Sequence, residues 1–159
     1  MRQTMEQLNN SRNGSGLTRS RYPSSKPQII PPFSLFWVDM LHDYLMLRPD
    51  SQFVRSYLPG MQGVLAWYLN RIDPQTGLLG QTPYWNFVDW TKAWPWSNAL
   101  QTGGVSPIAD SGQSVITALQ LAYTLEHARL ICTTFGQQEQ AKHYANQAKS
   151  LKTAALKWG

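Results

Sequence analysis

The sequence is poor in charge and almost free of cysteine. Only 14% of its 159 residues are charged, whereas globular chains typically have ~25%. Because charged residues normally cover a small domain, this deficit indicates a chain that lacks part of its natural surroundings or pairs with another surface. The single cysteine, Cys132, excludes an intramolecular disulfide and a cysteine-rich metal site. It follows Leu130 and Ile131, which favours a small buried hydrophobe over a nucleophile.

Long apolar runs, grouped histidines and a cationic stripe are also missing. No apolar run approaches the ~18 residues of a membrane helix, so we expect no membrane partner. The first residues do not form a signal peptide, and the compartment of a longer protein, whether periplasmic, extracellular or other, stays open. His42, His127 and His143 show no ligand spacing, so we expect no metal and no cofactor. The net charge of +5 is dispersed and forms no stripe, so we expect no nucleic-acid partner.

Four segments have the apolar spacing of α-helices, at about 33–48, 51–70, 112–134 and 137–158. The first is apolar on nearly every side, which predicts a helix buried all round, whereas the last has one apolar stripe and therefore lies outside. Residues 1–10 have the spacing of the end of a further helix. Pro59 falls inside the second segment, and because the apolar spacing continues on both sides of it, we expect a kink rather than a break.

Long loops, at about 11–32 and 71–112, alternate with tight turns along the chain. Asp50 and Ser111 are expected to cap helices, and Gly136 is expected to end one. The tight turns then lie at one end of the molecule and the long loops at the other. This layout predicts one all-α domain over residues 1–159, with an inner and an outer ring of helices. A four-helix bundle is disfavoured because it has short loops at both ends.

The second long loop is unusually aromatic. It holds four tryptophans within twelve residues, at Trp85, Trp90, Trp94 and Trp96. Loops normally run over the surface and are polar. Either this loop folds back as a small core of its own, or it lines a concave site where the flat apolar faces of a ligand, such as a sugar, stack on the rings.

Acidic residues offer few candidates for acid–base chemistry. The three glutamates are Glu6, Glu126 and Glu139. Glu126 lies far from the start of its predicted helix, and Glu139 opens the last one, where an acid stabilises the helix dipole, so neither position suits catalysis. Asp39 and Asp43 are four residues apart on one predicted helix, with His42 beside them, which is the best acid–base arrangement by spacing alone. We favour the alternative that these side chains are hydrogen-bonded to neighbouring helices or loops.

Several dispersed motifs resemble those of one known family. They are SRYPS at 20–24, IPPFSL at 30–35 followed by Trp37, HDY at 42–44, LPG at 58–60, GLLG at 77–80 and WNFVDW at 85–90. In this order they resemble the catalytic domain of bacterial α-L-rhamnosidases, which are inverting glycoside hydrolases with an (α/α)6 barrel. The resemblance runs from about residue 8 to the end of the chain.

The resemblance implies a partial (α/α)6 barrel, with roughly four of twelve helices and the end of a fifth. The two catalytic glutamates of the family would lie outside the chain, one on each side. The resemblance therefore implies a fragment of an enzyme that removes terminal α-L-rhamnose with inversion, and the fragment alone is expected to be inactive. The alternative is a non-catalytic carbohydrate-binding or scaffold protein built from helical hairpins.

The candidate binding residues come from the tryptophan loop and from the resemblance. Asp89 lies between Trp85 and Trp90, where a carboxylate could accept from sugar hydroxyls or could close a turn with its own backbone. Trp94 and Trp96 are expected to hold the loop in shape. Trp37, Arg21 and Tyr22 join the site by resemblance, although Trp37 also suits a core. The expected partner is a rhamnose-containing oligosaccharide or glycoside, and exposed helix faces are expected to cause self-association.

Overall fold

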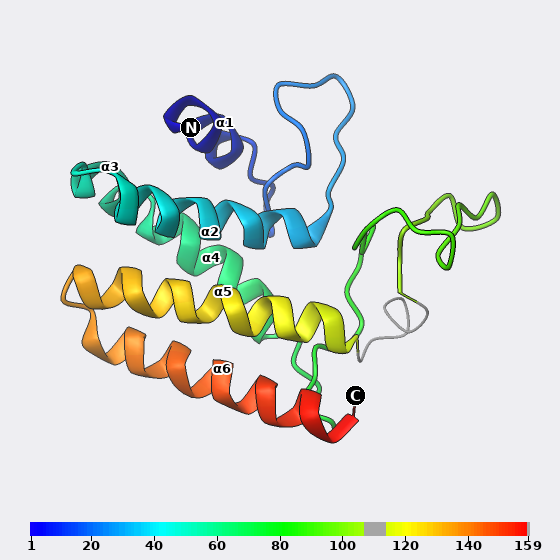
Figure 1. The fold of residues 1–159 in the computed structure, drawn as a ribbon. Helices are drawn as coiled ribbons and strands as arrows, with labels where there is room; N and C mark the ends of the chain where they lie inside the picture. Colours follow the sequence, from blue (N-terminus) through cyan, green and yellow to red (C-terminus); the bar gives the residue numbers. More distant parts are fainter. Residues whose placement is uncertain (107–113, 159) are drawn as a thin grey trace.

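The computed structural model describes residues 1–106 and 114–158, and its regular elements are all helices (Figure 1). They are α1 (Arg2–Asn10), α2 (Pro31–Leu47), α3 (Ser51–Arg55), α4 (Leu58–Leu69), α5 (Val115–Thr134) and α6 (Gln138–Trp158). Within these described ranges, β-structure is limited to two isolated bridges. The all-α prediction is confirmed. No helix in this part of the chain combines the length and the apolar character that crossing a membrane requires.

The long connections and the tight turns lie at opposite ends of the helices (Figure 1). Helices α2 and α5 lie side by side and both begin at the end where the long loops lie. Helix α6 runs back along α5 after a tight turn at the other end. The predicted alternation of short and long connections is therefore observed, and it places both long loops near the first turns of α2 and α5.

Helix α2 begins two residues earlier than predicted. Pro31 and Pro32 form its first turn instead of preceding it. A proline fits there because the first helical residues have no intrahelical partner for an N–H group. Ser34, expected near the helix start, is fully buried, and its Oγ accepts from the backbone N of Thr18 at 3.0 Å. Ser34 thus connects the first long loop to α2 by a buried hydrogen bond.

Helices α5 and α6 have well-defined ends. Ser114 caps α5, where its Oγ accepts from the backbone N of Thr117 at 3.3 Å, so the helix begins at Val115 and not near residue 112. The expected cap Ser111 lies outside the described residues. Gly136 has a φ of +74° in the turn before α6, a conformation that glycine adopts without steric cost. The predicted helix stop at Gly136 is confirmed.

The segment at 51–70 is two helices and not one kinked helix. A turn at Ser56 and Tyr57 separates α3 from α4. Pro59 has no N–H group, so the carbonyl of Arg55 receives no intrahelical hydrogen bond from it and the helix is interrupted. The prediction of a kink was wrong. The prediction that Asp50 caps the segment is confirmed, because its Oδ1 accepts from the backbone N of Phe53 at 3.3 Å.

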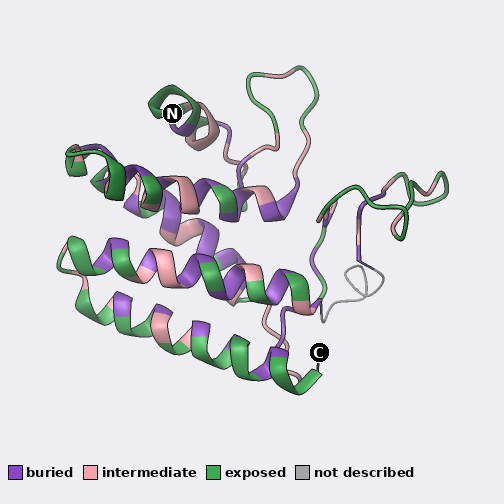
Figure 2. Ribbon diagram, viewed as in Figure 1, coloured by how far each residue is buried: buried purple, intermediate pink, exposed green. Residues whose placement is uncertain are grey.

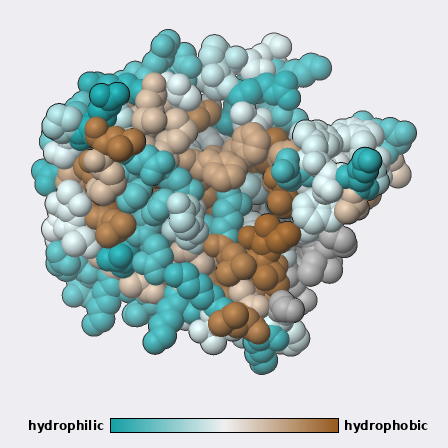
Figure 3. Space-filling view, in the orientation of Figure 1, coloured by the Kyte–Doolittle hydropathy of each residue, from teal (hydrophilic) through white to brown (hydrophobic). Residues whose placement is uncertain are grey.

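Buried residues of all six helices and of both long loops form one hydrophobic core (Figure 2). Helix α2 is not buried all round, because Phe36 is 52% exposed and Leu47 is 72% exposed. Helix α5 likewise exposes Ile116, Leu119 and Tyr123. Hydrophobic surface gathers over the first half of α5 and beside α2 (Figure 3). Within the described part of the chain, these two helices therefore have apolar faces that no other element covers.

Candidate functional site: an aromatic cavity at the loop end

A cavity of about 310 Å³ lies where the first long loop, the first turn of α2 and the tryptophan loop meet. Its lining combines five aromatic or aliphatic side chains from the two loops and α2 with three polar ones; the residues are Ser20, Arg21, Gln28, Ile30, Phe33, Trp85, Phe87 and Trp90. A volume of this size lies near the lower end of the range for small-molecule pockets, roughly 300–1,000 Å³. The cavity can therefore hold one sugar-sized ligand.

Aromatic rings form the walls of this cavity. Trp85 and Trp90 pack with their ring centroids 6.0 Å apart at 63°, and Phe87 lies 5.2 Å from Trp90. Phe33 of α2 meets the edge of Phe87 at 6.2 Å and joins the loop to the helix. Trp90 stays 59% exposed. The cluster thus presents a solvent-accessible indole face, which suits stacking on an apolar ligand face.

The tryptophan loop is held in shape by backbone contacts. The indole N–H of Trp85 donates to the carbonyl of Gly103 at 2.9 Å. The carbonyl of Gly104 accepts from the backbone N of Val88 at 2.7 Å, and the N of Gly104 donates to the carbonyl of Trp94. Trp96 packs against Trp85 with centroids 6.1 Å apart. Trp94 and Trp96 therefore support the loop, as expected from the sequence.

Gln28 holds Arg21 at the edge of the cavity. Its side-chain Oε1 accepts from Arg21 Nη2 at 2.8 Å and from Ser20 Oγ at 2.9 Å. Its backbone carbonyl also accepts from the N of Ser20 at 2.9 Å. These bonds close the segment between residues 20 and 28 into a loop. The partner that orients the guanidinium beside the aromatic rings is therefore a neutral amide and not a carboxylate.

The structure brings three of the six predicted site residues together, namely Trp85, Trp90 and Arg21. Asp89 and Tyr22 are exposed near them but do not line the cavity. Asp89 Oδ1 accepts from the backbone N of Trp90 at 2.7 Å, so this carboxylate bonds its own local backbone, although no turn forms there. The two interpretations of Asp89 remain compatible because a carboxylate has a second oxygen.

Trp37 does not line the main cavity, although it borders the smaller cavity of about 120 Å³ beside it. Its side chain is completely buried, and its indole N–H donates to the carbonyl of Met5 in α1 at 3.1 Å. The ring also meets the edge of Tyr57 at 6.2 Å. With no exposed face, Trp37 packs the core between α1 and α2 in this chain.

Five lining residues were not among the predicted site residues, namely Ser20, Gln28, Ile30, Phe33 and Phe87. Phe87 stands inside the tryptophan stretch, and Phe33 follows the two prolines, so both carried an aromatic signal near a predicted site. Gln28 had no such signal. Its role arises because the loop closes and brings Gln28 to Ser20 and Arg21. A short sequence pattern does not predict such a closure.

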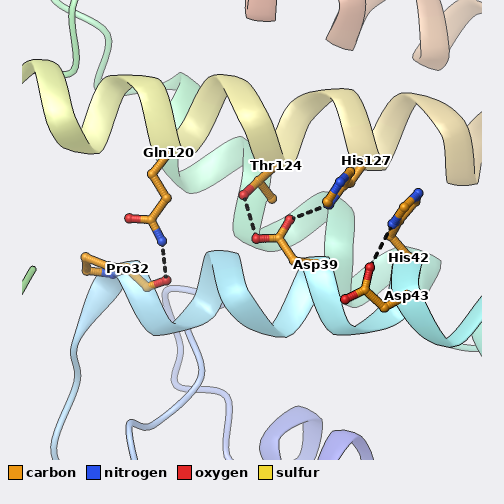
Figure 4. Close-up of polar contacts among 7 residues, drawn as sticks. All are labelled: Pro32, Asp39, His42, Asp43, Gln120, Thr124 and His127. Atoms are coloured by element: carbon orange, nitrogen blue, oxygen red, sulfur yellow. Dashed lines mark hydrogen bonds and ion pairs between the residues drawn. The ribbon is translucent and has the colours of Figure 1, made fainter.

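The acid–base candidates on α2 form a separate polar cluster against α5 (Figure 4). Asp39 accepts from Thr124 Oγ1 at 3.2 Å and lies 2.9 Å from His127 Nδ1. The ring of His42 stacks on His127 with centroids 3.9 Å apart, and its Nδ1 lies 3.1 Å from Asp43. Each carboxylate thus has a partner between or along the helices, which supports the structural interpretation of this cluster.

Burial sets the chemistry of the remaining titratable groups. Desolvation raises the pKa of Asp39, opposed by the attraction of His127. It also raises the pKa of Cys132 to about 11, so this thiol is a poor nucleophile. The hydrogen bond from Arg129 lowers the pKa of Glu126, which also pairs with Lys152. Among the described residues, no group of three or more acidic, histidine or cysteine side chains is placed to hold a metal.

Comparisons with known proteins found a matching family model and similar solved structures. The family model described as the bacterial alpha-L-rhamnosidase 6 hairpin glycosidase domain matches residues 1–157. A GH78 family rhamnosidase of Bacillus sp. GL1 is similar with a TM-score of 0.77 and 24% identity, over 96% of this chain and 14% of that one. A rhamnosidase from Klebsiella oxytoca with rhamnose bound is similar with a TM-score of 0.76 and 22% identity, over 98% of this chain and 28% of that one. No curated protein matches the chain.

Proposed function

Because this chain belongs to the family of bacterial α-L-rhamnosidase six-hairpin glycosidase domains, we propose that it is part of an enzyme that removes terminal α-L-rhamnose with inversion. The observation that carries the proposal is the cavity in which Trp85, Trp90 and Arg21 meet. Aromatic rings stack on the apolar faces of sugars, and a guanidinium donates to hydroxyl oxygens. In this proposal the residues that line the cavity form one wall of the rhamnose pocket.

The catalytic carboxyl groups belong elsewhere in the proposed enzyme. Inverting hydrolysis needs two carboxyl groups roughly 6.5–9.5 Å apart, one of them protonated. Glu126 forms ion pairs with Arg129 and Lys152. The other two glutamates, Glu6 and Glu139, are exposed, and none of the three lines the cavity. The chain spans 14% and 28% of the lengths of the two similar rhamnosidases. We therefore expect this chain alone to bind rhamnosides without hydrolysing them.

Asp89 and Tyr22 complete the proposed rim of the pocket. Asp89 Oδ1 accepts from the backbone N of Trp90, which leaves Oδ2 for a sugar hydroxyl. Tyr22 is 38% exposed in the same loop as Arg21. Trp37 is left out of the proposed pocket because its ring has no exposed face. The ligand therefore contacts the two loops and the first turn of α2 rather than the core.

The exposed apolar faces of α2 and α5 suggest a second kind of partner. Phe36, Ile116, Leu119 and Tyr123 are each more than 40% exposed on these two neighbouring helices. Contiguous apolar surface of this kind drives association in water. We propose that the isolated chain self-associates through these faces.

A titration with methyl α-L-rhamnoside tests the proposed pocket. Replacing Trp90 by alanine removes the exposed stacking face, and we expect affinity to fall about tenfold, since a sugar–aromatic contact is worth roughly 1 kcal/mol or more. Trp158→Ala is the matched control, because Trp158 is an exposed tryptophan on α6 that does not line the cavity. The proposal loses its support if the Trp90 variant binds the rhamnoside as tightly as the parent chain.

A further inference from the structure

The loop beside the cavity carries positive charge without any negative charge. Between residues 7 and 38 the sequence holds four cations and no aspartate or glutamate; the cations are Arg12, Arg19, Arg21 and Lys26. None of the four takes part in an ion pair within the described part of the chain. The described residues therefore leave this positive charge unneutralised next to the site.

Arg21 is the cation that reaches the cavity itself. Its Nη2 donates to the amide oxygen of Gln28 at 2.8 Å, a neutral partner that orients the guanidinium without cancelling its charge. The planar guanidinium has five N–H donors, and it binds carboxylates through two parallel hydrogen bonds. The Arg21 fork is thus oriented at the cavity edge with donors to spare.

Arg19 adds a second positive group on the same side. Its guanidinium carbon lies 6.0 Å from the ring of Tyr22. Arg19 lines a smaller neighbouring cavity of about 120 Å³, which shares Ser20 and Phe33 with the main cavity. The cationic side of the site therefore extends beyond the volume of one sugar ring.

Among the described residues, no acidic side chain lines either cavity, and Asp89 is placed at the rim rather than in the lining. A cavity with aromatic walls and an oriented, unneutralised guanidinium is complementary to a sugar face beside an anionic group. We infer that the site takes an acidic saccharide, in which the sugar next to rhamnose carries a uronate carboxylate bound by Arg21. This inference rests on the proposed rhamnose pocket and names the class of glycoside that it accepts.

The experiment compares a rhamnosyl-uronate disaccharide with its neutral methyl ester, and with methyl α-L-rhamnoside, by calorimetric titration of the chain. The acid is expected to bind about fivefold more tightly than the ester at low ionic strength, the upper range for a solvent-exposed ion pair. Added salt should reduce this preference because it screens exposed charges. Arg21→Gln should abolish the preference, whereas Lys142→Gln, which removes an exposed charge on α6, should retain it.

The possible outcomes separate the inference from the proposed function. Equal binding of the acid and its ester would overturn the acidic-saccharide inference and leave the rhamnose pocket standing. A preference for the acid that survives in Arg21→Gln would also overturn it, because Arg21 would not be the partner of the carboxylate. If none of the three ligands binds, the rhamnose pocket and the inference both fall.

Discussion

Gly104 is the residue on which the shape of the tryptophan loop depends most directly. Its φ is +65°, in the left-handed region, and its carbonyl accepts hydrogen bonds from the backbone N atoms of Val88 and Asp89. A Cβ atom at this position would lie 2.5 Å from Cε2 of Phe87 and 2.8 Å from the carbonyl oxygen of Asp89. A side chain here would therefore displace a wall of the cavity.

We predict that Gly104→Ala lowers the free energy of unfolding by about 2 kcal/mol or more, because an overpacking cost adds to the cost of the left-handed backbone. Gly136→Ala is a matched control, since Gly136 has a φ of +74° and no atom within 4 Å of the added Cβ. That control should lose only about 1 kcal/mol. Urea denaturation measures both, and equal losses would show that contact with Phe87 does not matter.

Site residues were predictable from the sequence where the signal was local. Trp85 and Trp90 stand in one aromatic stretch, and the structure brings them together in the cavity. Gln28 was not predictable, because its function arises only when the first loop closes on Ser20 and Arg21. The burial of Trp37 likewise depends on α1, whose contact with α2 no short pattern records.

At the scale of the helices, the Asp39 cluster joins α2 to α5. Burial raises the pKa of Asp39 above its ordinary value in spite of the neighbouring His127. A raised pKa in the folded state means that the folded state binds the proton more tightly than the unfolded state does. The stability that this group contributes is therefore present at acid pH and is lost as pH rises through its folded-state pKa.

We predict that Asp39→Asn gains stability relative to the parent chain as pH rises from below the ordinary carboxyl range towards neutrality. Each unit by which the folded pKa is raised corresponds to about 1.4 kcal/mol. The asparagine oxygen can still accept from Thr124, so the packing of α2 on α5 should persist. Denaturation at several pH values measures the difference, with Asp43→Asn as the control because Asp43 is 58% exposed and screened by water. A difference that shrinks with rising pH would contradict the assigned direction.

The helices themselves were largely predictable because apolar spacing records which face is buried. The interruption between α3 and α4 was not, since the core contacts of Phe53, Val54, Leu58 and Met61 continue across it. The spacing of apolar residues reflects these core contacts and therefore continues through the break. The break itself results from the missing N–H group of Pro59. The start of α5 was placed too early because Ser111 was expected to be its cap, whereas the residue that bonds to Thr117 is Ser114.

At the scale of the whole molecule, the alternation of short and long connections was sufficient to predict the helical architecture. The family match over residues 1–157 confirms the six-hairpin class. That residues 1–159 form a single partial domain stays a prediction. The sequence could not give the arrangement of the two loops around the cavity, because that depends on contacts between segments far apart in the chain.

We predict that the isolated chain forms dimers or larger oligomers through α2 and α5. Leu119→Gln should weaken this association about tenfold, because a leucine buried at an interface contributes roughly 1.5 kcal/mol or more. Leu156→Gln is the control, since Leu156 is 89% exposed on the outer helix α6. Light scattering over a range of concentrations measures the mass, and a monomer at all concentrations would contradict the prediction.

The seven indole N–H signals of the chain give the most direct test of the central claim, that the tryptophan loop is a wall of a rhamnose pocket. Their nuclear magnetic resonance positions can be followed one by one during titration with methyl α-L-rhamnoside. We expect the signals of Trp85 and Trp90 to shift, while those of Trp67 and Trp158, which do not line the cavity, stay in place. Shifts confined to Trp67 or Trp158, or no shift at saturating rhamnoside, would contradict it.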